Sequence, residues 1–464
     1  MTAKQFINIK SPLTDEIIGQ VPAMSKEEVD EVIQKAKEAF KLWRDKPLHE
    51  RVEYLYKVAD LLLENEEALT DLLIKEVGKD KKSAKSEVVR TADLIKFTAD
   101  TAKNMHGQNI NADSFPGGNK GKFAIIKRVP IGVVLAVSPF NYPVNLAASK
   151  IAPALVGGNS VVFKPATQGS LSGSFLAKLF IEAGLPEGVL GIVTGRGSQI
   201  GDYVVTHQDI NFINFTGSTE VGNHIAKEAK MVPLLMELGG KDAAVVLEDA
   251  DLDLTANHIV SGAFAYSGQR CTAIKRVMVI NEVADTLTEK IKEEMKKLKV
   301  GNPMEVDEAL DVVPLINEGA ADFVEGLIKE AKEKGAKLLC GGERKGNLIT
   351  PTLFDNVTTD MRLAWEEPFG PVLPIIRVGS VEESIKITNA SEYGLQASVF
   401  TTNMHRAFEV ADKLEVGTVQ INNKTERGPD HLPFLGVKSS GIGVQGISYS
   451  IEAMTRIKST VINL

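Results

Sequence analysis

Apolar strands and helices alternate along the middle of this chain, and that alternation limits the possible folds more than any other feature of the sequence. Four short apolar runs are typical of strands covered on both faces, at 133–138, 160–163, 189–193 and 210–215. A helical pattern follows each run, at 144–156, 171–183, 198–206 and 219–229. Strands and helices that alternate at this spacing form βαβ units, so the sequence predicts an α/β fold with a parallel sheet.

A second α/β unit is predicted after residue 240. Its strands are expected near 243–247, 276–280, 372–377 and 398–401. Its helices are expected near 253–267, 283–297, 318–334 and 404–414. A chain of 464 residues exceeds a typical single domain of roughly 100–200 residues, so two or three domains are expected.

The two ends of the chain have patterns of their own. Helical patterns near the N-terminus cover 29–42, about 48–77 and 82–104. A capping box at 25–28 precedes the first of them. Residues 107–121 are rich in Asn, Gly and Pro and predict a turn or hairpin. The tail, 455–464, alternates apolar and polar residues like an edge strand, and such a chain end often pairs with another subunit.

Composition argues against several classes of function. The net charge of −8 disfavours nucleic acid or an anionic membrane as the main partner, since both attract basic surfaces. No apolar stretch reaches the ~18 residues of a membrane span, and the N-terminus has no signal-like apolar run. Two cysteines in a chain of this length fit a reducing compartment, so we expect a cytoplasmic protein. None of the seven histidines has a metal-ligand spacing, so we expect no metal.

Cys271 is a candidate nucleophile, because a thiol attacks carbonyl groups near neutral pH with little help. Arg270 beside it would favour the thiolate if the two side chains approach each other. Glu237 and Asn141 lie in other segments and suit a general base and an amide donor to an oxyanion. Each also has a structural alternative: a buried thiol, a carboxylate tied to a backbone donor, and a turn residue.

The standard fingerprint of a dinucleotide-binding loop is absent. The segment 195–201 has the wrong glycine spacing, and 217–222 lacks the Lys-Ser/Thr ending of a phosphate loop. A nucleotide could still lie across the carboxyl ends of the strands, with its phosphates near a helix N-terminus. Residues 215–219 suit that role, and a plain helix cap explains them equally well.

Together these segments closely resemble the aldehyde dehydrogenase family over nearly the whole chain. The resemblance is carried by Ser138-Pro-Phe-Asn141, Phe163-Lys-Pro165, Phe215-Thr-Gly-Ser218, Glu237-Leu-Gly-Gly-Lys241, Gly268-Gln-Arg-Cys271, Glu367-Pro-Phe-Gly-Pro371 and Pro433-Phe-Leu-Gly436. It implies an aldehyde dehydrogenase-like α/β fold of three parts, assembled as a homotetramer built from dimers. The parts are a five-stranded Rossmann-like cofactor domain at 1–107 and 129–240, a catalytic α/β domain at 241–450, and a small β oligomerisation extension at 108–128 and 451–464.

The resemblance also implies a role for individual residues. Cys271 would attack an aldehyde, Asn141 and the Cys271 backbone N–H would hold the oxyanion, and Glu237 would activate the water that hydrolyses the thioester. The cofactor would be bound by Ser138, Lys164, Thr167, Asp202, Gly217, Ser218, Glu367 and Phe369. Many NAD-dependent relatives have an acidic residue three positions after the lysine of Phe-Lys-Pro, where this chain has Thr167. A carboxylate would repel a 2′-phosphate, so NADP is expected as the cofactor.

Within the family, four segments are most similar to members that oxidise D-glyceraldehyde 3-phosphate to 3-phosphoglycerate with NADP and take up no phosphate. These segments are 86–91, 138–145, 269–276 and 421–427. The substrate's phosphate group would be bound by Arg90, Tyr142, Arg270, Thr272 and Arg427. For any single arginine, a surface salt bridge is the alternative.

Three other functions stay open at this stage. The chain could be an NAD(P)-dependent dehydrogenase of another small semialdehyde, an enzyme that transfers the acyl group to coenzyme A, or a catalytically silent protein on the same scaffold. Acylating relatives generally lack the glutamate found here at position 237, so its presence favours water as the acceptor. The chain departs from the family at its N-terminus, where the usual opening hairpin before Ile7 is missing, which puts the local edge packing in doubt.

Overall fold

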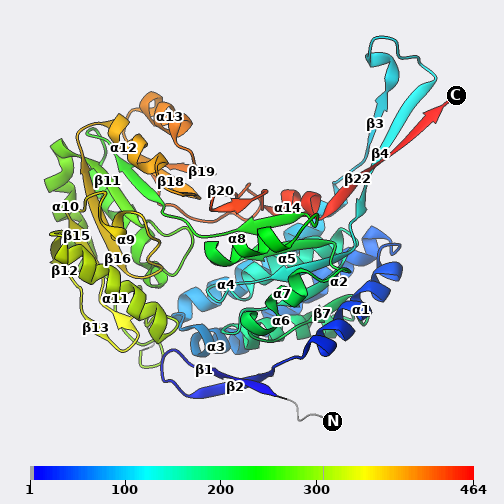
Figure 1. The fold of residues 1–464 in the computed structure, drawn as a ribbon, viewed down its shortest axis with the longest axis horizontal. Helices are drawn as coiled ribbons and strands as arrows, with labels where there is room; N and C mark the ends of the chain where they lie inside the picture. Colours follow the sequence, from blue (N-terminus) through cyan, green and yellow to red (C-terminus); the bar gives the residue numbers. More distant parts are fainter. Residues whose placement is uncertain (1–4, 307) are drawn as a thin grey trace.

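Five parallel strands form the sheet of the N-terminal unit, which lies to the right in Figure 1. In sheet order they are β9 (Leu234–Glu237), β8 (Phe212–Thr216), β5 (Val133–Val137), β6 (Ser160–Lys164) and β7 (Leu190–Ile192). A two-residue strand, β21 (Gly441–Ile442), pairs antiparallel with β9 and makes the sheet six-stranded. The computed structural model describes residues 5–306 and 308–464.

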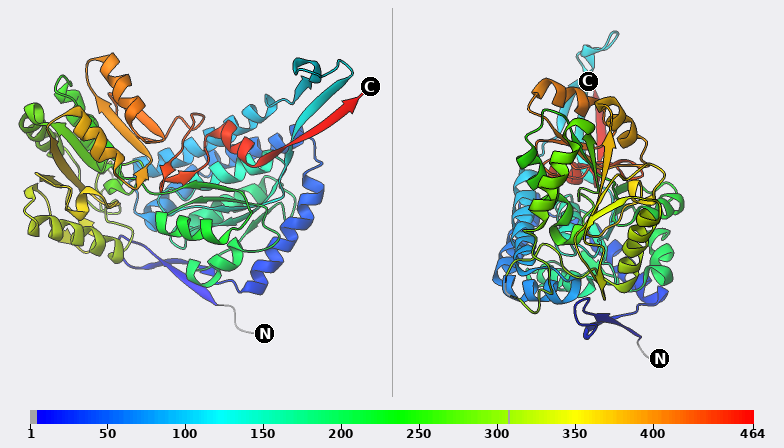
Figure 2. Two further views of the ribbon diagram at one scale, coloured as in Figure 1. Left: turned by 45° about the horizontal axis from the view of Figure 1, so that its top comes forward. Right: turned by 90° about the vertical axis from the view of Figure 1, so that its left-hand side faces the viewer.

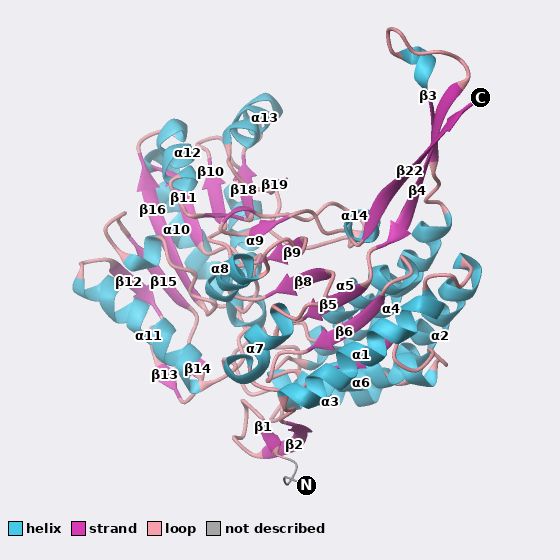
Figure 3. Ribbon diagram, turned by 45° about the vertical axis from the view of Figure 1, so that its right-hand side comes forward, coloured by secondary structure: helices cyan, strands magenta, loops and turns pink. Residues whose placement is uncertain are grey.

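Helices cover both faces of this sheet (Figure 3). One face packs against α2 (Leu48–Glu64), α3 (Glu66–Val77), α4 (Lys81–Lys103), α5 (Asn145–Val156), α6 (Ser170–Glu182) and α14 (Ile447–Ala453). The other face packs against α1 (Lys26–Trp43), α7 (Gly197–Val205) and α8 (Thr219–Glu228). The predicted capping box begins α1, since the Glu28 N–H donates to Ser25 Oγ (3.3 Å) and the Ser25 N–H donates to the Glu28 carboxylate (2.9 Å).

The second unit is built on a seven-stranded sheet. In sheet order its strands are β12 (Lys337–Cys340), β15 (Thr352–Asp355), β16 (Val372–Val378), β11 (Arg276–Ile280), β10 (Ala243–Val246), β18 (Gln396–Phe400) and β19 (Thr418–Ile421). All neighbours are parallel except β12 and β15. Helices flank the sheet: α9 (Leu252–Phe264), α10 (Asn281–Met295), α11 (Glu318–Glu333), α12 (Val381–Asn389) and α13 (Met404–Lys413). The α/β class expected from the sequence is confirmed.

A three-stranded arm projects from the N-terminal unit (Figure 2). It consists of β3 (Gln108–Asn111), β4 (Lys122–Pro130) and β22 (Thr455–Asn463). The C-terminal strand β22 pairs antiparallel with the whole of β4, from Thr455 opposite Pro130 to Asn463 opposite Lys122. The hairpin expected at 107–121 and the edge strand expected at 455–464 therefore belong to one sheet.

Smaller elements join these parts. They include the hairpin of β1 (Phe6–Lys10) and β2 (Ile17–Pro22), the short strands β13 (Arg344–Lys345), β14 (Leu348–Ile349), β17 (Tyr393–Gly394) and β20 (Val437–Lys438), and three 3-10 turns, η1 (Ala112–Ser114), η2 (Ala265–Gly268) and η3 (Arg362–Ala364). The β1–β2 hairpin buries Ile7, Ile9 and Val21, so the edge packing that the sequence put in doubt is present from residue 5 onward.

The division of the chain into functional domains stays a prediction. The two large sheets lie on either side of residue 240, but β21 belongs to the N-terminal sheet although it falls within the range 241–450. Residues 1–4 of the first predicted range lie outside the described part. Among the residues described, none of the helices combines the length and the apolar character that a membrane crossing needs.

Candidate functional site

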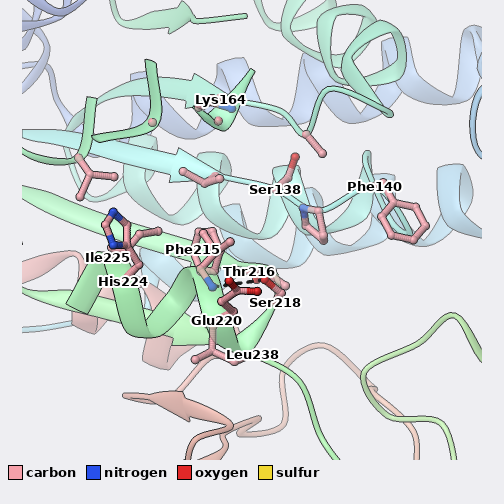
Figure 4. A pocket seen from close by; sticks show the side chains of 18 of the residues that line it. Ser138, Phe140, Lys164, Phe215, Thr216, Ser218, Glu220, His224, Ile225 and Leu238 are labelled. Carbon is pink, nitrogen blue, oxygen red and sulfur yellow. Dashed lines mark hydrogen bonds between the residues drawn. The ribbon is translucent and has the colours of Figure 1, made fainter. Parts of the chain in front are cut away.

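A cavity of about 1170 Å³ opens at the carboxyl ends of β5, β6 and β8 (Figure 4). Ligands of open parallel sheets bind at this edge, outside the carboxyl ends of the strands. All eight residues expected to bind a cofactor line this cavity: Ser138, Lys164, Thr167, Asp202, Gly217, Ser218, Glu367 and Phe369. Asn141 and Cys271 line it as well, so the cavity joins the expected cofactor positions to the candidate nucleophile.

At two helix N-termini near the cavity, different groups accept hydrogen bonds from the backbone N–H groups of the first turn. The Glu76 carboxylate occupies the start of α6, where it accepts the N–H groups of Gly169 (3.0 Å), Leu171 (2.7 Å) and Ser172 (2.8 Å). The start of α8 has only the Ser218 cap, whose hydroxyl accepts the Val221 N–H (3.3 Å). The start of α7, where Gly197 and Ser198 line the cavity, has no side-chain cap. Since the first turn of a helix attracts anions, the starts of α7 and α8 can take a cofactor phosphate, whereas that of α6 is already occupied by Glu76.

The cavity wall also holds polar groups that suit a dinucleotide. Ser138 Oγ is buried and has no hydrogen-bond partner among the described residues. Lys164 lies beside it, 9% exposed, and burial lowers the pKa of its ammonium group. An unsatisfied buried hydroxyl and a partly desolvated ammonium at the wall of a large cavity fit a polar, anionic ligand, because such groups are otherwise costly to bury.

Glu237 contacts Cys271, which lines this cavity together with Asn141. The Cys271 thiol donates to Glu237 Oε1 (3.3 Å), and the Glu237 side chain, at the end of β9, is 2% exposed. Asn141, in the loop after β5, donates through Nδ2 to the carbonyl oxygen of Gln269 (2.9 Å), two residues before the thiol. Within the described residues the backbone N–H of Cys271 has no acceptor. The structure thus brings together the three residues that the sequence singled out for chemistry.

A strained turn presents the thiol. Tyr266, Ser267 and Gly268 have consecutive left-handed backbones, with φ of 54°, 56° and 70°. A Cβ on Gly268 would lie 2.7 Å from the Gly370 carbonyl, so this position accepts only glycine. Strained backbone of this kind persists where surrounding structure fixes it.

Distant segments supply that support. The Tyr266 hydroxyl donates to the Val77 carbonyl (2.6 Å), and the Ser267 hydroxyl donates to the Val313 carbonyl (2.6 Å). The Gln269 side-chain oxygen accepts the N–H of Ile316 (3.0 Å). The turn is therefore held from both sheet units.

Sequence reasoning missed a chain of contacts behind Glu237. Glu237 Oε2 accepts from the Arg427 guanidinium and from the Thr216 hydroxyl (3.3 Å). Lys150 in α5 in turn donates to Thr216 Oγ1 (2.7 Å). Burial lowers the pKa of Lys150 to about 7. Lys150 is the one charged residue of segment 145–156, and that isolation was the signal that could have identified this position.

The charges around the thiol differ from the expectation based on its sequence neighbour. Burial, and then the Glu237 carboxylate, hold the pKa of Cys271 well above its usual value. The cations that oppose this shift are Lys275 and Arg427. Arg270 instead points its guanidinium at the Gly262 carbonyl, so the idea that it favours the thiolate is wrong.

The expected phosphate ligands do not form one uncompensated cluster. Arg90 binds the Asp430 carboxylate through two nitrogens (2.7 and 2.8 Å) and also donates to the Arg427 carbonyl (2.9 Å). Arg427 is neutralised by Glu237. Arg270 keeps a buried Nε without a partner among the described residues. Two of the three arginines thus have carboxylate partners, and no dianion is needed to balance them.

Tyr142 and Thr272 lie close to these arginines in the fold. Tyr142 and Arg90 line a second cavity of about 290 Å³. The Lys79 ammonium lies 3.5 Å from the centre of the Tyr142 ring. Thr272 is buried next to the nucleophile, and its carbonyl accepts from the Thr425 hydroxyl (2.8 Å).

Among the described residues, no group of three or more His, Cys, Asp or Glu side chains could hold a metal ion.

Comparison with known proteins identifies several close relatives. A sequence model of the aldehyde dehydrogenase family matches residues 1–460. NADP-dependent glyceraldehyde-3-phosphate dehydrogenase from Streptococcus equinus is 59% identical over 462 residues, which cover 100% of this chain and 96% of that protein. The enzyme of the same name from Pisum sativum is 50% identical over 100% of this chain and 93% of that protein. A crystal structure of the Bacillus halodurans C-125 enzyme of that name, complexed with NADP, is 58% identical and superposes with a TM-score of 0.97 over 99% of this chain and 96% of that one.

Proposed function

The chain belongs to the aldehyde dehydrogenase family, and we propose that it oxidises D-glyceraldehyde 3-phosphate to 3-phosphoglycerate with reduction of NADP and without uptake of inorganic phosphate. One observation carries the chemistry: the Cys271 thiol lies 3.3 Å from the Glu237 carboxylate at a cavity large enough for a dinucleotide. The relatives at 59% and 50% identity are NADP-dependent glyceraldehyde-3-phosphate dehydrogenases, which supports the substrate and the cofactor.

Cys271 begins the reaction by attacking the aldehyde carbon. Glu237 Oε1 already accepts the thiol hydrogen, so it takes the proton as the carbon–sulfur bond forms. The carbonyl oxygen becomes an oxyanion, which Asn141 Nδ2 and the free Cys271 N–H are placed to bind. Loss of one such donor typically costs roughly 2.7–4 kcal/mol of transition-state stabilisation.

NADP, when bound, supplies the hydride acceptor. Ser138, Lys164, Thr167, Asp202, Gly217, Ser218, Glu367 and Phe369 line the cavity that would hold it. Thr167 and Lys164 favour a 2′-phosphate because neither is acidic and one adds positive charge. Comparing kcat/KM for NADP and NAD tests this preference, and equal values would refute it.

Water completes the reaction at the same sulfur. Once Glu237 has released the thiol's proton to solvent, it removes a proton from the water that attacks the thioester carbon. It then passes this proton to the sulfur as the carbon–sulfur bond breaks and the acid leaves. Coenzyme A is the weaker candidate acceptor, because Glu237 is present and directed at the sulfur. A dehydrogenase of another small semialdehyde stays the alternative.

The substrate's phosphate group is assigned to Arg90, Tyr142, Arg270, Thr272 and Arg427. The unsatisfied Nε of Arg270 is the observation that best supports an anionic ligand here. Arg427 would contact both Glu237 and the substrate, so it joins substrate recognition to the base.

A single assay tests the proposed function. NADPH formation is followed with glyceraldehyde 3-phosphate, with and without inorganic phosphate. Turnover that does not depend on phosphate supports the proposal, and turnover that requires phosphate or coenzyme A refutes it.

The remaining expectations form part of this proposal. They are the three-domain division, the homotetramer and the cytoplasmic location. Ile457 and Val461 on the arm strand β22 are 64% and 52% exposed, as expected for a strand that meets another subunit. Both cysteines are free, as expected in a reducing compartment.

A further inference from the structure

Lys275 is a buried lysine that joins the nucleophile turn to the wall of the cofactor cavity. Its side chain is 2% exposed and lies four residues after Cys271. The ammonium group donates to the Cys271 carbonyl and forms an ion pair with Glu367 Oε1 (2.9 Å). A buried ammonium must be paired, and both partners of this one belong to residues of the proposed site.

Glu367 extends the connection to the segment that carries the base. Its Oε1 also accepts the N–H of Gly240 (3.2 Å), three residues after Glu237. A Cβ on Gly239 would lie 2.2 Å from Glu367 Oε2, so a side chain at this position would displace the carboxylate from where it now lies. The Cys271 carbonyl, Lys275, Glu367 and Gly240 thus form one continuous series of polar contacts.

Lys275 is a cation on the nucleophile's own segment, and unlike Arg270, whose guanidinium donates to the Gly262 carbonyl, it donates to the carbonyl of Cys271 itself. Three other charged groups face the thiol: Glu237 from β9, Arg427 from the loop after β19, and Lys150 from α5. Arg427 is bound to Glu237, and Lys150 donates to a hydroxyl. Among the described residues, Glu367 is the carboxylate that forms an ion pair with Lys275.

Other charged groups surround Lys275 on the side away from the thiol. They are Lys241, Asp242 and Arg276, all buried. Lys241 donates to the Glu366 carbonyl (2.7 Å), and Arg276 donates to three backbone carbonyls. Lys241 and Asp242 interact electrostatically with Glu367, but among the described residues none of these three groups forms a hydrogen bond or ion pair with Cys271 or with the Glu367 side chain, so Lys275 is the direct link between the two.

We propose that Lys275 is a positioning residue that holds Glu367 in place for the cofactor and favours the thiolate form of Cys271. Its charge is shared between two partners, so a change at one partner alters its effect on the other. Removing the Glu367 charge leaves the ammonium free to act on the thiol, whereas removing the ammonium leaves the thiol with less positive charge nearby. The proposal depends on the proposed function only in taking the cavity as the cofactor site.

The test measures alkylation of Cys271 by iodoacetamide as a function of pH in the free protein. A Cys340→Ser background leaves Cys271 as the reactive thiol. The variants are Lys275→Met, Lys275→Arg and Glu367→Gln. Lys241→Met is the matched control, because it removes an equally buried lysine from the same neighbourhood. The dissociation constant for NADP is measured for each variant by fluorescence.

The expected shifts have opposite signs. Lys275→Met raises the pH midpoint of alkylation by about one unit and weakens NADP binding about tenfold. Lys275→Arg stays close to the parent in both measurements, Glu367→Gln lowers the midpoint, and Lys241→Met changes neither.

Two results would overturn the proposal. One is a Lys275→Met protein with the parent midpoint and parent NADP affinity. The other is a Glu367→Gln midpoint that stays constant or rises, which decides the question even if Lys275→Met does not fold. If the proposed function is wrong, the parent protein will not oxidise glyceraldehyde 3-phosphate. The pH dependence of Cys271 alkylation does not depend on that reaction, so the two failures can be told apart.

Discussion

Replacing Glu237 by glutamine should make the Cys271 thiol considerably more acidic. The substitution keeps the size of the side chain and a hydrogen-bond acceptor 3.3 Å from the sulfur, but removes the negative charge. It also removes the closer of the two carboxylates that pair with Arg427, which keeps Asp430 at 3.8 Å. Both changes favour the thiolate, because the carboxylate that contacts the sulfur loses its charge and the Arg427 guanidinium is less fully neutralised.

The size of the effect follows from the geometry. Two unit charges 4 Å apart interact by about 4 kcal/mol at an effective dielectric constant of 20, which corresponds to roughly three pH units. The Glu237 charge is spread over two oxygens and is partly cancelled by Arg427. We therefore expect the pKa of Cys271 to fall by about two units in the Glu237→Gln protein.

The rate of alkylation by iodoacetamide against pH measures this directly in the Cys340→Ser background. Glu220→Gln is the control, because Glu220 lines the same cavity without contacting the thiol. A Glu237→Gln midpoint equal to or above that of the parent would refute the reasoning, since it would mean that the carboxylate does not act on the sulfur. A fall of the same size in Glu220→Gln would show that the effect is not local.

Three further substitutions test other parts of the site. Arg427→Ala should raise KM for glyceraldehyde 3-phosphate at least about tenfold, because a charged hydrogen bond to the phosphate is lost. KM for an uncharged aldehyde should stay near the parent value. If steady-state kinetics show equal rises of KM for both substrates, the phosphate assignment is wrong. Thr167→Asp should lower kcat/KM for NADP by about tenfold or more with little change for NAD, since a carboxylate repels the 2′-phosphate, and parallel losses would place that phosphate elsewhere. Asp242 is fully buried, and burial raises its pKa to about 7. The folded protein therefore keeps a proton that the unfolded chain releases as pH rises from about 4 to 7, so stability falls across that window and Asp242→Asn removes the loss. Chemical denaturation should show a gain for Asp242→Asn that is about 3 kcal/mol larger at about pH 8 than at about pH 5, and a pH-independent gain would contradict the assignment.

Local signals predicted much of the fold. The capping box at Ser25 and Glu28 begins α1, and the apolar runs at 133–138 and 160–163 are β5 and β6. The predicted helix at 48–77 is two helices divided at Asn65, whose side chain donates to the Leu61 carbonyl.

Elements that depend on distant partners were missed. The strand β9 has only four residues and owes its conformation to pairing with β8, with Leu234 opposite Ile213. The strand β19 is likewise four residues long, is half-buried throughout, and pairs with β18. Neither leaves a periodic pattern that a single sequence can show.

In the candidate site, too, local sequence was enough for some residues, whereas contacts between distant residues could not be predicted. Residue type and motif were enough to select Cys271, Glu237 and Asn141. The partner of Glu237 was not predictable, because Arg427 lies 190 residues away in the sequence. Arg270 misled for the opposite reason: it is next to Cys271 along the chain, yet its guanidinium points at Gly262.

The left-handed turn before Cys271 also bears on when the protein becomes reactive during folding. Its supports come from Val77, 189 residues from Tyr266, from Val313, 46 residues from Ser267, and from Asn141, 128 residues from Gln269. Contacts between such distant residues form late, because long loops must close before they are made. We therefore expect the nascent chain to carry an ordinary cysteine at position 271 until both sheet units have docked. The strained turn that presents the Cys271 thiol is then a product of complete folding, and any motion that parts the two units should dismantle that turn reversibly.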